Sequence, residues 1–452
     1  MSDRKKIIKP GAISGFPEWT PDIRLIELKW LDHIRQTFES YGFASIETPS
    51  VEEIDVLLAK GETDKEIYTL TRLQAEAEDD KEARLGLHFD QTVPLARYTA
   101  QHFNHLTFPF KRYQIQKVWR GERPQLGRAR EFYQCDIDVI NVDHLPLHFD
   151  AEMPAVIYEA MDGLDIGKFQ VRISNRKILL GLLESLDISD VITVTRTVDK
   201  LDKIGSDEVA NSLSKDADLS SQAIDKIIDL VTNATLEKIS AESKMMEEGL
   251  DELSFVCGQL GHLPGHAVLP DLSIVRGLDY YTGTVYETRL LDIPEFTSSV
   301  CSGGRYDDLA GSFINRHLPG VGISIGFTRL FEVLHHYGYI RPGGASCPTD
   351  VLVFLESEEK RDIANATAAR LRRRGVNVEL YHEAKKNYGK NLNKQLSYAE
   401  KKGIPYVWFP PTEDISSHQV KDLESREQVD ADPDIWTPKI APANKVNRDE
   451  AS

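Results

Sequence analysis

The sequence predicts an α+β protein that carries a small α/β domain at its C-terminal end. Residues 23–41 space their apolar side chains by three and four, as an amphipathic helix does, and Gly42 is expected to end it before a strand at 43–51. Two regions of β-type alternation are separated by residues 174–260, where Leu, Ile, Asp, Lys and Ser recur with helical spacing. Beyond residue 348, apolar runs alternate with helical patterns, which predicts a largely parallel sheet.

The same patterns predict the domain boundaries. Arg341–Pro348, R-P-G-G-A-S-C-P, has the composition of a linker, and the polar chain past Asp430 is expected to be loosely ordered. The elements expected after the linker are strands at 351–355, 377–381 and 405–409, a helix ending at Arg374 and a helix beginning at Asn391. The expected parts are a core of residues 1–173 and 261–340, an insertion of residues 174–260, a linker at 341–348, an α/β domain at 349–430 and a tail at 431–452.

Bulk composition is typical of a soluble intracellular protein. The 452 residues suffice for two or three domains, and the contents of hydrophobic residues (41%) and charged residues (28%) are ordinary. The N-terminal M-S-D-R-K-K lacks the apolar segment of a signal peptide, and no apolar run approaches the ~20 residues that span a bilayer. The distant cysteines Cys135, Cys257, Cys301 and Cys347 favour reduced thiols over disulfides or a zinc site. We therefore expect a cytoplasmic protein without membrane contact.

The net charge of -18 argues against general affinity for nucleic acids. Binding phosphates requires only a local basic surface, however, because salt screens charges beyond ~8–10 Å. Two local concentrations lie near the C-terminal end, at Arg370–Arg374 and Lys385–Lys394. Either cluster is an RNA contact or simply the solvated face of a helix.

The segment Val275–Glu287, V-R-G-L-D-Y-Y-T-G-T-V-Y-E, combines arginine, acidic residues, tyrosines and two glycines in a stretch that otherwise alternates like a strand. Glycine weakens a strand and often marks the close approach of a ligand or another backbone. The segment therefore predicts either a binding site around Arg276 and Tyr280-Tyr281 or a surface hairpin with an exposed arginine.

Three further segments carry unusual polar residues. Residues 108–140, F-P-F-K-R-Y-Q-I-Q-K-V-W-R-G-E-R-P-Q-L-G-R-A-R-E-F-Y-Q-C-D-I-D-V-I, predict a strand ending at Arg120, a loop and a second strand. Residues 299–331 contain G-V-G-I-S-I-G-F-T-R-L, in which Arg329 opens a predicted helix. Upstream, Leu87–Thr92 read L-H-F-D-Q-T.

In this order the four segments resemble the signatures of histidyl-tRNA synthetases, a family of class II aminoacyl-tRNA synthetases. The helix and strand of Ile23–Val51 resemble motif 1, which forms the dimer interface in this class. The resemblance implies a core with an antiparallel sheet flanked by helices, a helical insertion and a C-terminal anticodon-binding domain. It also implies a homodimeric histidine–tRNA ligase. Such an enzyme activates L-histidine with ATP to histidyl-adenylate, releases pyrophosphate and transfers histidine to the 3′ end of tRNA(His).

The resemblance implies arginines around the phosphates of ATP. Activation joins the histidine carboxylate to the α-phosphorus, which requires positioning and positive charge more than an acid or a base. An arginine fork pairs with two phosphate oxygens and stays charged. Mg²⁺ is implied by the triphosphate, although no carboxylate cluster in the sequence indicates its ligands. The implied catalytic residues are Arg276, Arg120 and Gln134, and the implied ATP-binding residues are Arg120, Glu122, Arg128, Phe132, Arg276 and Arg329.

A pocket for L-histidine is implied as well. Asp90, Thr92 and Gln134 are the matching partners for the α-ammonium group, while Asp138 and Tyr281 are those for the two nitrogens of the imidazole. A site that satisfies such polar groups rejects amino acids that leave them unpaired, by factors of ~10⁴ or more. The complete implied set is Asp90, Gln91, Thr92, Gln134, Asp138, Arg276, Tyr280, Tyr281 and Tyr306.

The sequence departs from the family pattern at a few positions. His88 stands where arginine is usual, and Thr328 stands where an acid frequently precedes the motif 3 arginine. Asp138 replaces a longer glutamate, and Asp90 with Gln91 is more similar to the D-L-T variant of the pocket than to E-G-T. None of these changes removes a charge that the chemistry requires.

Two other functions are compatible with parts of the sequence. Histidine biosynthesis uses a non-catalytic paralogue of this synthetase as the regulatory subunit of ATP phosphoribosyltransferase, and that paralogue generally lacks the anticodon domain and the arginine at position 276. The second alternative is a general RNA-binding module on a synthetase-like fold, because a fold does not determine a function. Arg276 and the C-terminal α/β region favour the ligase.

Overall fold

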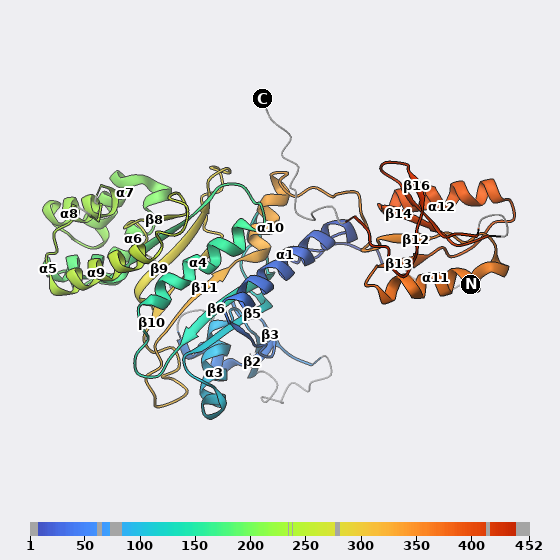
Figure 1. Ribbon diagram of the computed structural model, residues 1–452. Helices are drawn as coiled ribbons and strands as arrows, with labels where there is room; N and C mark the ends of the chain where they lie inside the picture. Colours follow the sequence, from blue (N-terminus) through green and yellow to red (C-terminus); the bar gives the residue numbers. More distant parts are fainter. Residues whose placement is uncertain are drawn as a thin grey trace, which may run out of the picture. The chain divides into compact units, whose positions relative to one another are not determined.

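The computed structural model describes residues 8–60, 66–72, 84–233, 235–236, 238–275, 281–412 and 416–439. The chain divides into two units, each with its own sheet (Figure 1). The first unit comprises Met1–Pro17 and Leu31–Tyr339, and the second comprises Glu18–Trp30 and Ile340–Ser452.

An eight-stranded sheet forms the centre of the first unit, with the strand order β1-β5-β6-β11-β10-β9-β7-β8. All pairings from β5 through β7 are antiparallel, whereas β1 and β8 join the two ends in parallel. The α+β fold with a large antiparallel sheet is therefore confirmed. The strands are β1 (Ala44–Ser45), β5 (Phe110–Trp119), β6 (Glu131–Ile140), β7 (Phe169–Asn175), β8 (Val268–Pro270), β9 (Tyr281–Leu290), β10 (Cys301–Tyr306) and β11 (Gly320–Ile325).

Strands β5 and β6 form a hairpin that pairs over ten residues. Side chains alternate between the two faces of a strand, so residues two apart share a face. On one face this alternation gathers polar side chains from both strands. The residues that lie opposite each other there are Arg112 and Asp138, Gln114 and Asp136, and Gln116 and Gln134.

Helix α1 (Pro21–Ser40) is amphipathic, as the spacing of its apolar residues predicts, and Ile34 and Phe38 are fully buried. The chain turns at Gly42, whose φ of +79° favours glycine, and enters the short strand β1. The strand expected at 43–51 is interrupted before β2 (Val51–Glu53). Pro49 has no N–H to give to a ladder, which accounts for the break.

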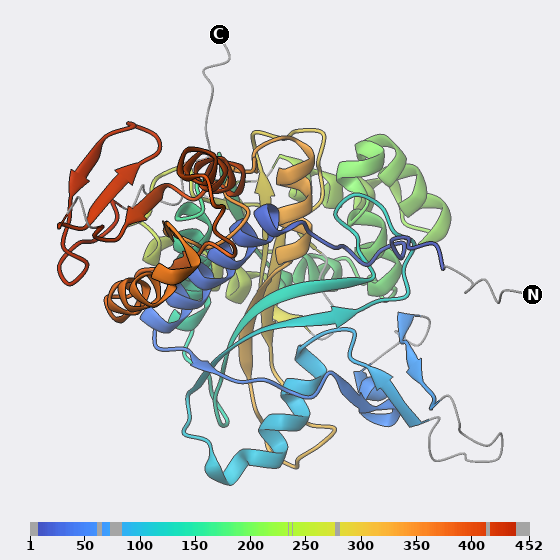
Figure 2. The same ribbon diagram turned by 90° about the vertical axis from the view of Figure 1, so that its right-hand side faces the viewer.

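Helices α4 (His148–Asp162) and α10 (Phe327–His336) pack on the large sheet, against β11 and β6 respectively (Figure 1). A second, three-stranded sheet with the order β2-β4-β3 lies close to helix α3 (Thr92–His102) (Figure 2). Leu57, Phe89 and Val93 form the small core between them. The remaining elements here are α2 (Ile54–Leu57), β3 (Thr69–Leu70), β4 (Leu85–Leu87) and two 3₁₀ helices, Leu58–Lys60 and Phe103–His105.

The region between β7 and β8 is helical, as its sequence pattern predicts. Helices α5 and α9 pack so closely that a Cβ on Gly181 would lie 2.4 Å from the Met246 nitrogen. Polar residues cap four of the helices, and each accepts a hydrogen bond from the first turn: Asn175, Asp190, Ser220 and Ser243. The helices are α5 (Arg176–Ser185), α6 (Val191–Val198), α7 (Leu201–Asp216), α8 (Ser221–Thr232) and α9 (Lys244–Gln259).

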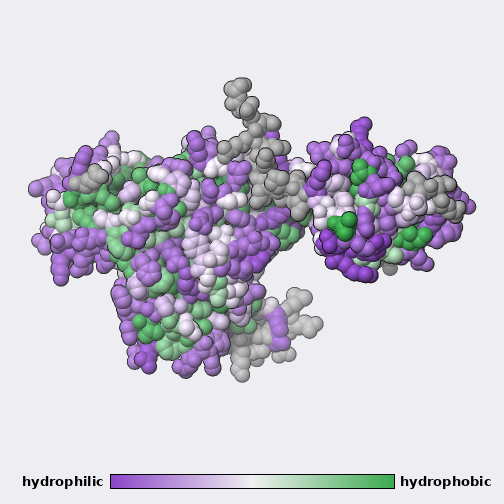
Figure 3. All heavy atoms as spheres, in the orientation of Figure 1, coloured by the Kyte–Doolittle hydropathy of each residue, from purple (hydrophilic) through white to green (hydrophobic). Residues whose placement is uncertain are grey.

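The second unit contains a five-stranded sheet with the order β13-β12-β14-β15-β16. Strands β13, β12 and β14 are parallel, whereas β15 and β16 add an antiparallel hairpin, so the sheet is less parallel than the sequence predicts. The face of this unit that Figure 3 shows is mainly hydrophilic, with separate hydrophobic residues. The elements are β12 (Val351–Val353), a 3₁₀ helix (Glu358–Lys360), α11 (Arg361–Arg373), β13 (Val378–Leu380), α12 (Tyr388–Lys402), β14 (Tyr406–Phe409), β15 (Gln419–Asp422) and β16 (Gln428–Asp430).

The chain immediately past Asp430 packs on this sheet. The Ala431 nitrogen donates to the His418 carbonyl, and Trp436 stacks edge-on against Tyr406 and Trp408. The polar tail expected from position 431 therefore includes an ordered turn before the described chain ends at residue 439.

Cys135, Cys257, Cys301 and Cys347 are all free thiols. Within the part of the chain that the structure describes, no helix is both long enough and apolar enough to cross a bilayer.

Candidate active site

Two adjoining pockets lie over the polar face of the large sheet. The larger holds about 620 Å³ and is lined by the arginines of motifs 2 and 3, so we call it the arginine pocket. The smaller holds about 260 Å³ and is lined by Asp136 and Asp138, so we call it the aspartate pocket. Ser302 of β10 and Ser324 of β11 line both pockets. A molecule in one pocket therefore lies next to a molecule in the other.

The arginine pocket contains the described residues that the sequence assigns to ATP. Arg120 follows the last residue of β5, and its Nε donates to the Phe89 carbonyl at 3.0 Å. Its guanidinium lies over the Phe132 ring, 5.2 Å from the centroid. The Phe89 carbonyl and the Phe132 ring thus hold the Arg120 side chain in place. The predicted residues that line this pocket are Arg120, Glu122, Arg128, Phe132, Gln134 and Arg329.

Arg329 lies in the first turn of α10 and reaches two backbone carbonyls. Its Nε donates to Gly127 at 2.8 Å, and its Nη1 donates to Ser299 at 2.9 Å. The preceding residue, Thr328, accepts a hydrogen bond from the Tyr133 nitrogen at 2.9 Å through its hydroxyl. Thr328 thus ties α10 to β6, a role that the sequence did not indicate.

In the aspartate pocket, Asp138 is held by two partners. Its Oδ1 accepts a hydrogen bond from the Tyr306 hydroxyl at 3.0 Å, and its Oδ2 is 2.5 Å from Nη2 of the fully buried Arg112. Burial raises the pKa of Asp138 to about 6, while Arg112 and Tyr306 act in the opposite direction. The carboxylate is therefore mostly ionised at neutral pH. Arg112 is a site residue that sequence reasoning missed.

The glycines of β11 and β10 make room for this arrangement. A Cβ on Gly322 would lie 1.9 Å from Asp138 Oδ1, and one on Gly303 would lie 2.1 Å from the Gly322 carbonyl oxygen. These positions accept only glycine because the neighbouring strand and the carboxylate occupy the space.

Asp136 was also missed by the sequence analysis. Its side chain is 4% exposed and lines the aspartate pocket, and its Oδ1 has no hydrogen-bond partner among the described residues. Burial raises its pKa to about 7, against the opposing effects of Arg112 and of a hydrogen bond with Ser324. The signal was present in the β6 sequence, because Gln134, Asp136 and Asp138 are two residues apart and share a face.

Thr92, Tyr281 and Tyr306 also line the aspartate pocket, whereas Asp90 and Gln91 are not among its lining residues. Gln91 is fully buried, and its amide donates to the carbonyls of Gln116 and Gln134 at 3.0 and 3.1 Å. Asp90 Oδ1 accepts from the Val93 nitrogen at 3.2 Å in the first turn of α3. Gln91 therefore fastens α3 to the hairpin.

His88 belongs to the framework under the site. It is fully buried, its ring stacks on Trp119 at 5.5 Å, and its Nε2 bonds to the Lys117 carbonyl at 2.8 Å. Burial lowers the pKa of His88, which keeps the ring neutral, so Nε2 is the protonated nitrogen that donates.

Arg276 and Tyr280, which the sequence assigns to the site, lie outside the described residues. Among the residues that are described, no group of three or more His, Cys, Asp or Glu side chains is arranged to hold a metal ion. The described residues therefore supply no protein cage for Mg²⁺.

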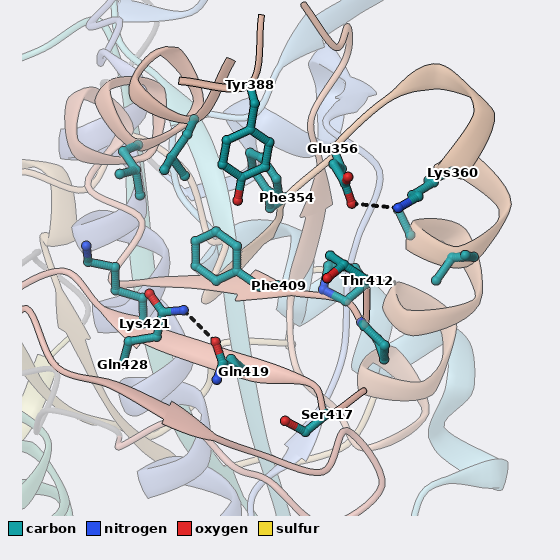
Figure 4. A pocket seen from close by; sticks show the side chains of 16 residues that line it. Phe354, Glu356, Lys360, Tyr388, Phe409, Thr412, Ser417, Gln419, Lys421 and Gln428 are labelled. Carbon is teal, nitrogen blue, oxygen red and sulfur yellow. Dashed lines mark hydrogen bonds and ion pairs between the residues drawn. The ribbon is translucent and has the colours of Figure 1, made fainter. Parts of the chain in front are cut away.

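A third cavity, of about 730 Å³, lies in the second unit (Figure 4). The aromatic side chains of Phe354, Tyr388 and Phe409 lie on one side of it. Polar side chains from the β15–β16 hairpin form another side: Gln419, Lys421 and Gln428.

Comparison with known proteins identifies both units. A family model described as Histidyl-tRNA synthetase matches residues 20–330, and one described as Anticodon binding domain matches residues 350–435. A protein named Histidine--tRNA ligase from Thermobifida fusca (strain YX) is 58% identical over 96% of this chain and 100% of its own length. A Micrococcus luteus protein of the same name is 46% identical over 95% of this chain and 96% of its own.

Solved structures are similar to this chain as well. A histidyl-tRNA synthetase structure from Nostoc sp. PCC 7120 is 40% identical, with a TM-score of 0.84 over 94% of this chain and 97% of that one. A Bacillus halodurans C structure titled as an ATP phosphoribosyltransferase regulatory subunit/histidyl-tRNA synthetase shares the fold at 22% identity, with a TM-score of 0.66 over 83% of this chain and 93% of that one. The chain therefore belongs to the histidyl-tRNA synthetase family.

Proposed function

We propose that this protein is a histidine–tRNA ligase. It activates L-histidine with ATP to histidyl-adenylate, releases pyrophosphate and transfers histidine to the 3′ end of tRNA(His). The observation that carries this conclusion is the 58% identity to a histidine–tRNA ligase over its complete length, including the anticodon-binding domain. The regulatory paralogue is not supported, because that alternative generally lacks the C-terminal domain that this chain contains.

ATP occupies the arginine pocket in this proposal. Arg120 stabilises the charge on the α-phosphate, and Arg276 approaches it from the other side while orienting the histidine carboxylate. Arg128 and Arg329 bind the rest of the triphosphate, and the two hydrogen bonds that fix Arg329 support a preorganised contact. Such preorganised charge is the main catalytic resource for phosphoryl and nucleotidyl transfer.

Adenine binds between the Phe132 ring and the Arg329 guanidinium, with Glu122 reading its amino group. Stacking and cation–π contact are the interactions that such a pair offers. Glu122 and Arg128 are neighbours, 3.5 Å apart between Oε2 and Nη1, in the same pocket. Mg²⁺ enters as the ATP complex, because it keeps several waters and needs few protein ligands when phosphates are present.

L-Histidine occupies the aspartate pocket, with its carboxylate at the boundary marked by Ser302 and Ser324. The shared serines support this placement, because the carboxylate must reach the α-phosphorus in the neighbouring pocket. Asp138 and Tyr281 bind the imidazole nitrogens, and Tyr306 forms a further wall while holding Asp138. Asp90, Thr92 and Gln134 contact the α-ammonium group.

The second unit binds tRNA in this proposal. Its aromatic side chains suit stacking with unpaired bases, and the amides of Gln419 and Gln428 suit hydrogen bonding to base edges. Of the two basic clusters, Arg370 is engaged with Asp432 and Asp434, so it is not a free phosphate contact. Lys386, Lys390 and Lys394, near the start of α12, are exposed and favour the second cluster.

In this proposal the protein is a homodimer and is located in the cytoplasm. Strand β1 is an exposed edge of the large sheet, and Leu28 of α1 is 46% exposed in the single chain. Such an edge and apolar position suit a self-complementary interface.

The decisive experiment is ATP–pyrophosphate exchange by the purified protein with each amino acid, followed by charging of tRNA(His). We expect exchange with L-histidine at least about 10⁴-fold above that with other amino acids. A protein that binds histidine without exchange or charging would be a regulatory paralogue. Charging of a different tRNA with a different amino acid would overturn the assignment altogether.

A further inference from the structure

We propose that Asp136 binds the α-ammonium group of L-histidine, together with Gln134. The inference rests on the proposed function and adds a residue to the substrate site that the family resemblance did not indicate. Its basis is the position of Asp136 in the wall of the aspartate pocket, hydrogen-bonded with Ser324, and the absence of a hydrogen-bond partner for its Oδ1 among the described residues.

Two acceptor oxygens lie on the same face of β6 without a partner. They are Asp136 Oδ1 and Gln134 Oε1, both buried and neither hydrogen-bonded among the described residues. Buried acceptors are nearly always satisfied in folded proteins, so such a pair indicates that a ligand supplies the donors. The terminal torsions of Asp and Gln are soft, so either oxygen turns toward a donor at little cost. A group with three N–H donors and a positive charge fits both acceptors.

Ser324 locates this pair at the boundary between the pockets. The Gln134 amide donates to the Ser324 hydroxyl at 3.2 Å, and Ser324 also hydrogen-bonds with Asp136. Ser324 lines both pockets. The histidine α-carbon must lie at this boundary, because its carboxylate faces ATP in one pocket and its ring enters the other. The α-ammonium group is attached to that carbon, so it meets Asp136 and Gln134 first.

The other two carboxylates near this position are already engaged. Asp138 pairs with Arg112 and accepts from Tyr306, and Asp90 Oδ1 accepts from the backbone of α3. Arg112 pairs with Asp138 instead, so Asp136 forms no ion pair within 4 Å among the described residues. Asp136 is therefore a further carboxylate with capacity for a cation.

The test compares two ligands that differ only at the amino group. L-Histidine and 3-(imidazol-4-yl)propanoate are titrated calorimetrically into wild type, Asp136→Asn and the control Asp143→Asn, an exposed aspartate just past β6. We expect Asp136→Asn to weaken L-histidine about 10- to 100-fold, the scale for losing a hydrogen bond to a charged group. Affinity for the propanoate should stay within about three-fold, because it lacks the ammonium. Asp143→Asn should match wild type.

Equal losses for both ligands, or no loss for either, would overturn the role of Asp136. The first result would mean that Asp136 merely balances the charge of Arg112 in the fold. If Asp136→Asn does not fold, Ser324→Ala provides the same comparison, since it removes the hydroxyl that accepts from the Gln134 amide and hydrogen-bonds with Asp136, and it too should weaken L-histidine selectively. Wild type that binds no L-histidine would instead contradict the proposed function.

Discussion

At the scale of single residues, the position of Asp138 depends on contacts from three strands. Arg112 of β5 pairs with one oxygen, Tyr306 of β10 donates to the other, and Gly322 of β11 leaves the space that the carboxylate fills. A buried ion pair of this kind contributes specificity more than stability, because desolvation offsets much of the attraction. In the proposed function, the fixed carboxylate is a rigid partner for the imidazole.

Gly322→Ala should therefore damage histidine binding. The added methyl would lie 1.9 Å from Asp138 Oδ1, so the carboxylate must move. We expect the KM for histidine to rise at least about 10-fold, the scale for losing one polar contact, while the KM for ATP changes little. Gly258→Ala is the control, since nothing lies within 4 Å of its Cβ in α9. An unchanged KM for histidine in Gly322→Ala would contradict the role of Asp138.

Asp136 should make the stability of the ligand-free protein depend on pH. Its folded pKa, about 7, lies above the unfolded value of about 3.9. The native state therefore binds more protons between these values, and stability falls as pH rises through that window. Asp136→Asn should raise the ligand-free Tm at pH 8 by roughly a few degrees. The gain should shrink at pH 5, where wild-type Asp136 is protonated.

Differential scanning calorimetry at both pH values checks this prediction. Among the described residues, the charged groups that act on Asp136 are Asp90, Arg112 and Asp138, and they are present in both proteins. Saturating L-histidine should stabilise wild type more than the variant, because the ammonium favours the ionised carboxylate. Equal Tm differences at pH 5 and pH 8 would show that Asp136 does not titrate in this range.

Arg276 should act mainly in the transition state of activation. If it stabilises the charge that develops on the α-phosphate, Arg276→Ala should lower the adenylation rate about 10²–10³-fold, the usual scale for one preorganised donor. Histidine affinity should weaken less, and Arg276→Lys should recover little, because a point charge does not span carboxylate and phosphate together. Single-turnover adenylation measures this, and a near wild-type rate in Arg276→Ala would favour the surface hairpin instead.

The residues of the site fall into two groups: those that lie within one short sequence motif, and those whose partners are distant in the sequence. The grouping of Arg120, Phe132, Arg128 and Arg329 around one pocket could be predicted, because each lies within a contiguous motif. Arg112 and Asp136 could not be assigned in the same way. Their partners come from strands more than 20 and up to about 200 residues away in the chain, and only the register of β5, β6 and β11 brings them together.

At the scale of elements, strong periodicity predicted α1, α5–α9 and the β12–α11–β13 alternation, while the β15–β16 hairpin was not predicted. Its strands, Q-V-K-D and Q-V-D, are short and polar and carry no apolar run. They form because β14 offers a paired edge, so tertiary context decides their structure. This unpredicted hairpin supplies one wall of the cavity that we assign to tRNA.

Tyr388→Ala should separate tRNA charging from histidine activation. Tyr388 is 53% exposed and lines the cavity of the second unit, so its loss removes a stacking surface without opening a core. We expect kcat/KM for tRNA to fall about 10-fold or more, as for the loss of one base–aromatic stack, with pyrophosphate exchange unchanged. Tyr337→Ala, at a 39% exposed tyrosine of the first unit, is the control. A parallel fall in exchange and charging would contradict this division of roles.

At the scale of the whole molecule, a net charge of -18 limits non-specific contact with RNA and concentrates recognition in local surfaces. The same consideration applies to self-association: like-charged chains associate only where apolar and backbone groups are complementary. The exposed edge strand β1 and the exposed Leu28 of α1 offer such groups in one contiguous stretch of sequence.

The protein should therefore be a homodimer through the Ile23–Val51 helix and strand. Multi-angle light scattering at micromolar concentration should give twice the 51.0 kDa mass of one chain. Leu28→Glu should shift the mass toward the monomer, because two-fold symmetry introduces the buried charge twice. Leu291→Glu, at a leucine that is 41% exposed outside this stretch, should leave the dimer intact. A monomer mass for wild type at every concentration, or equal effects of both substitutions, would exclude this interface.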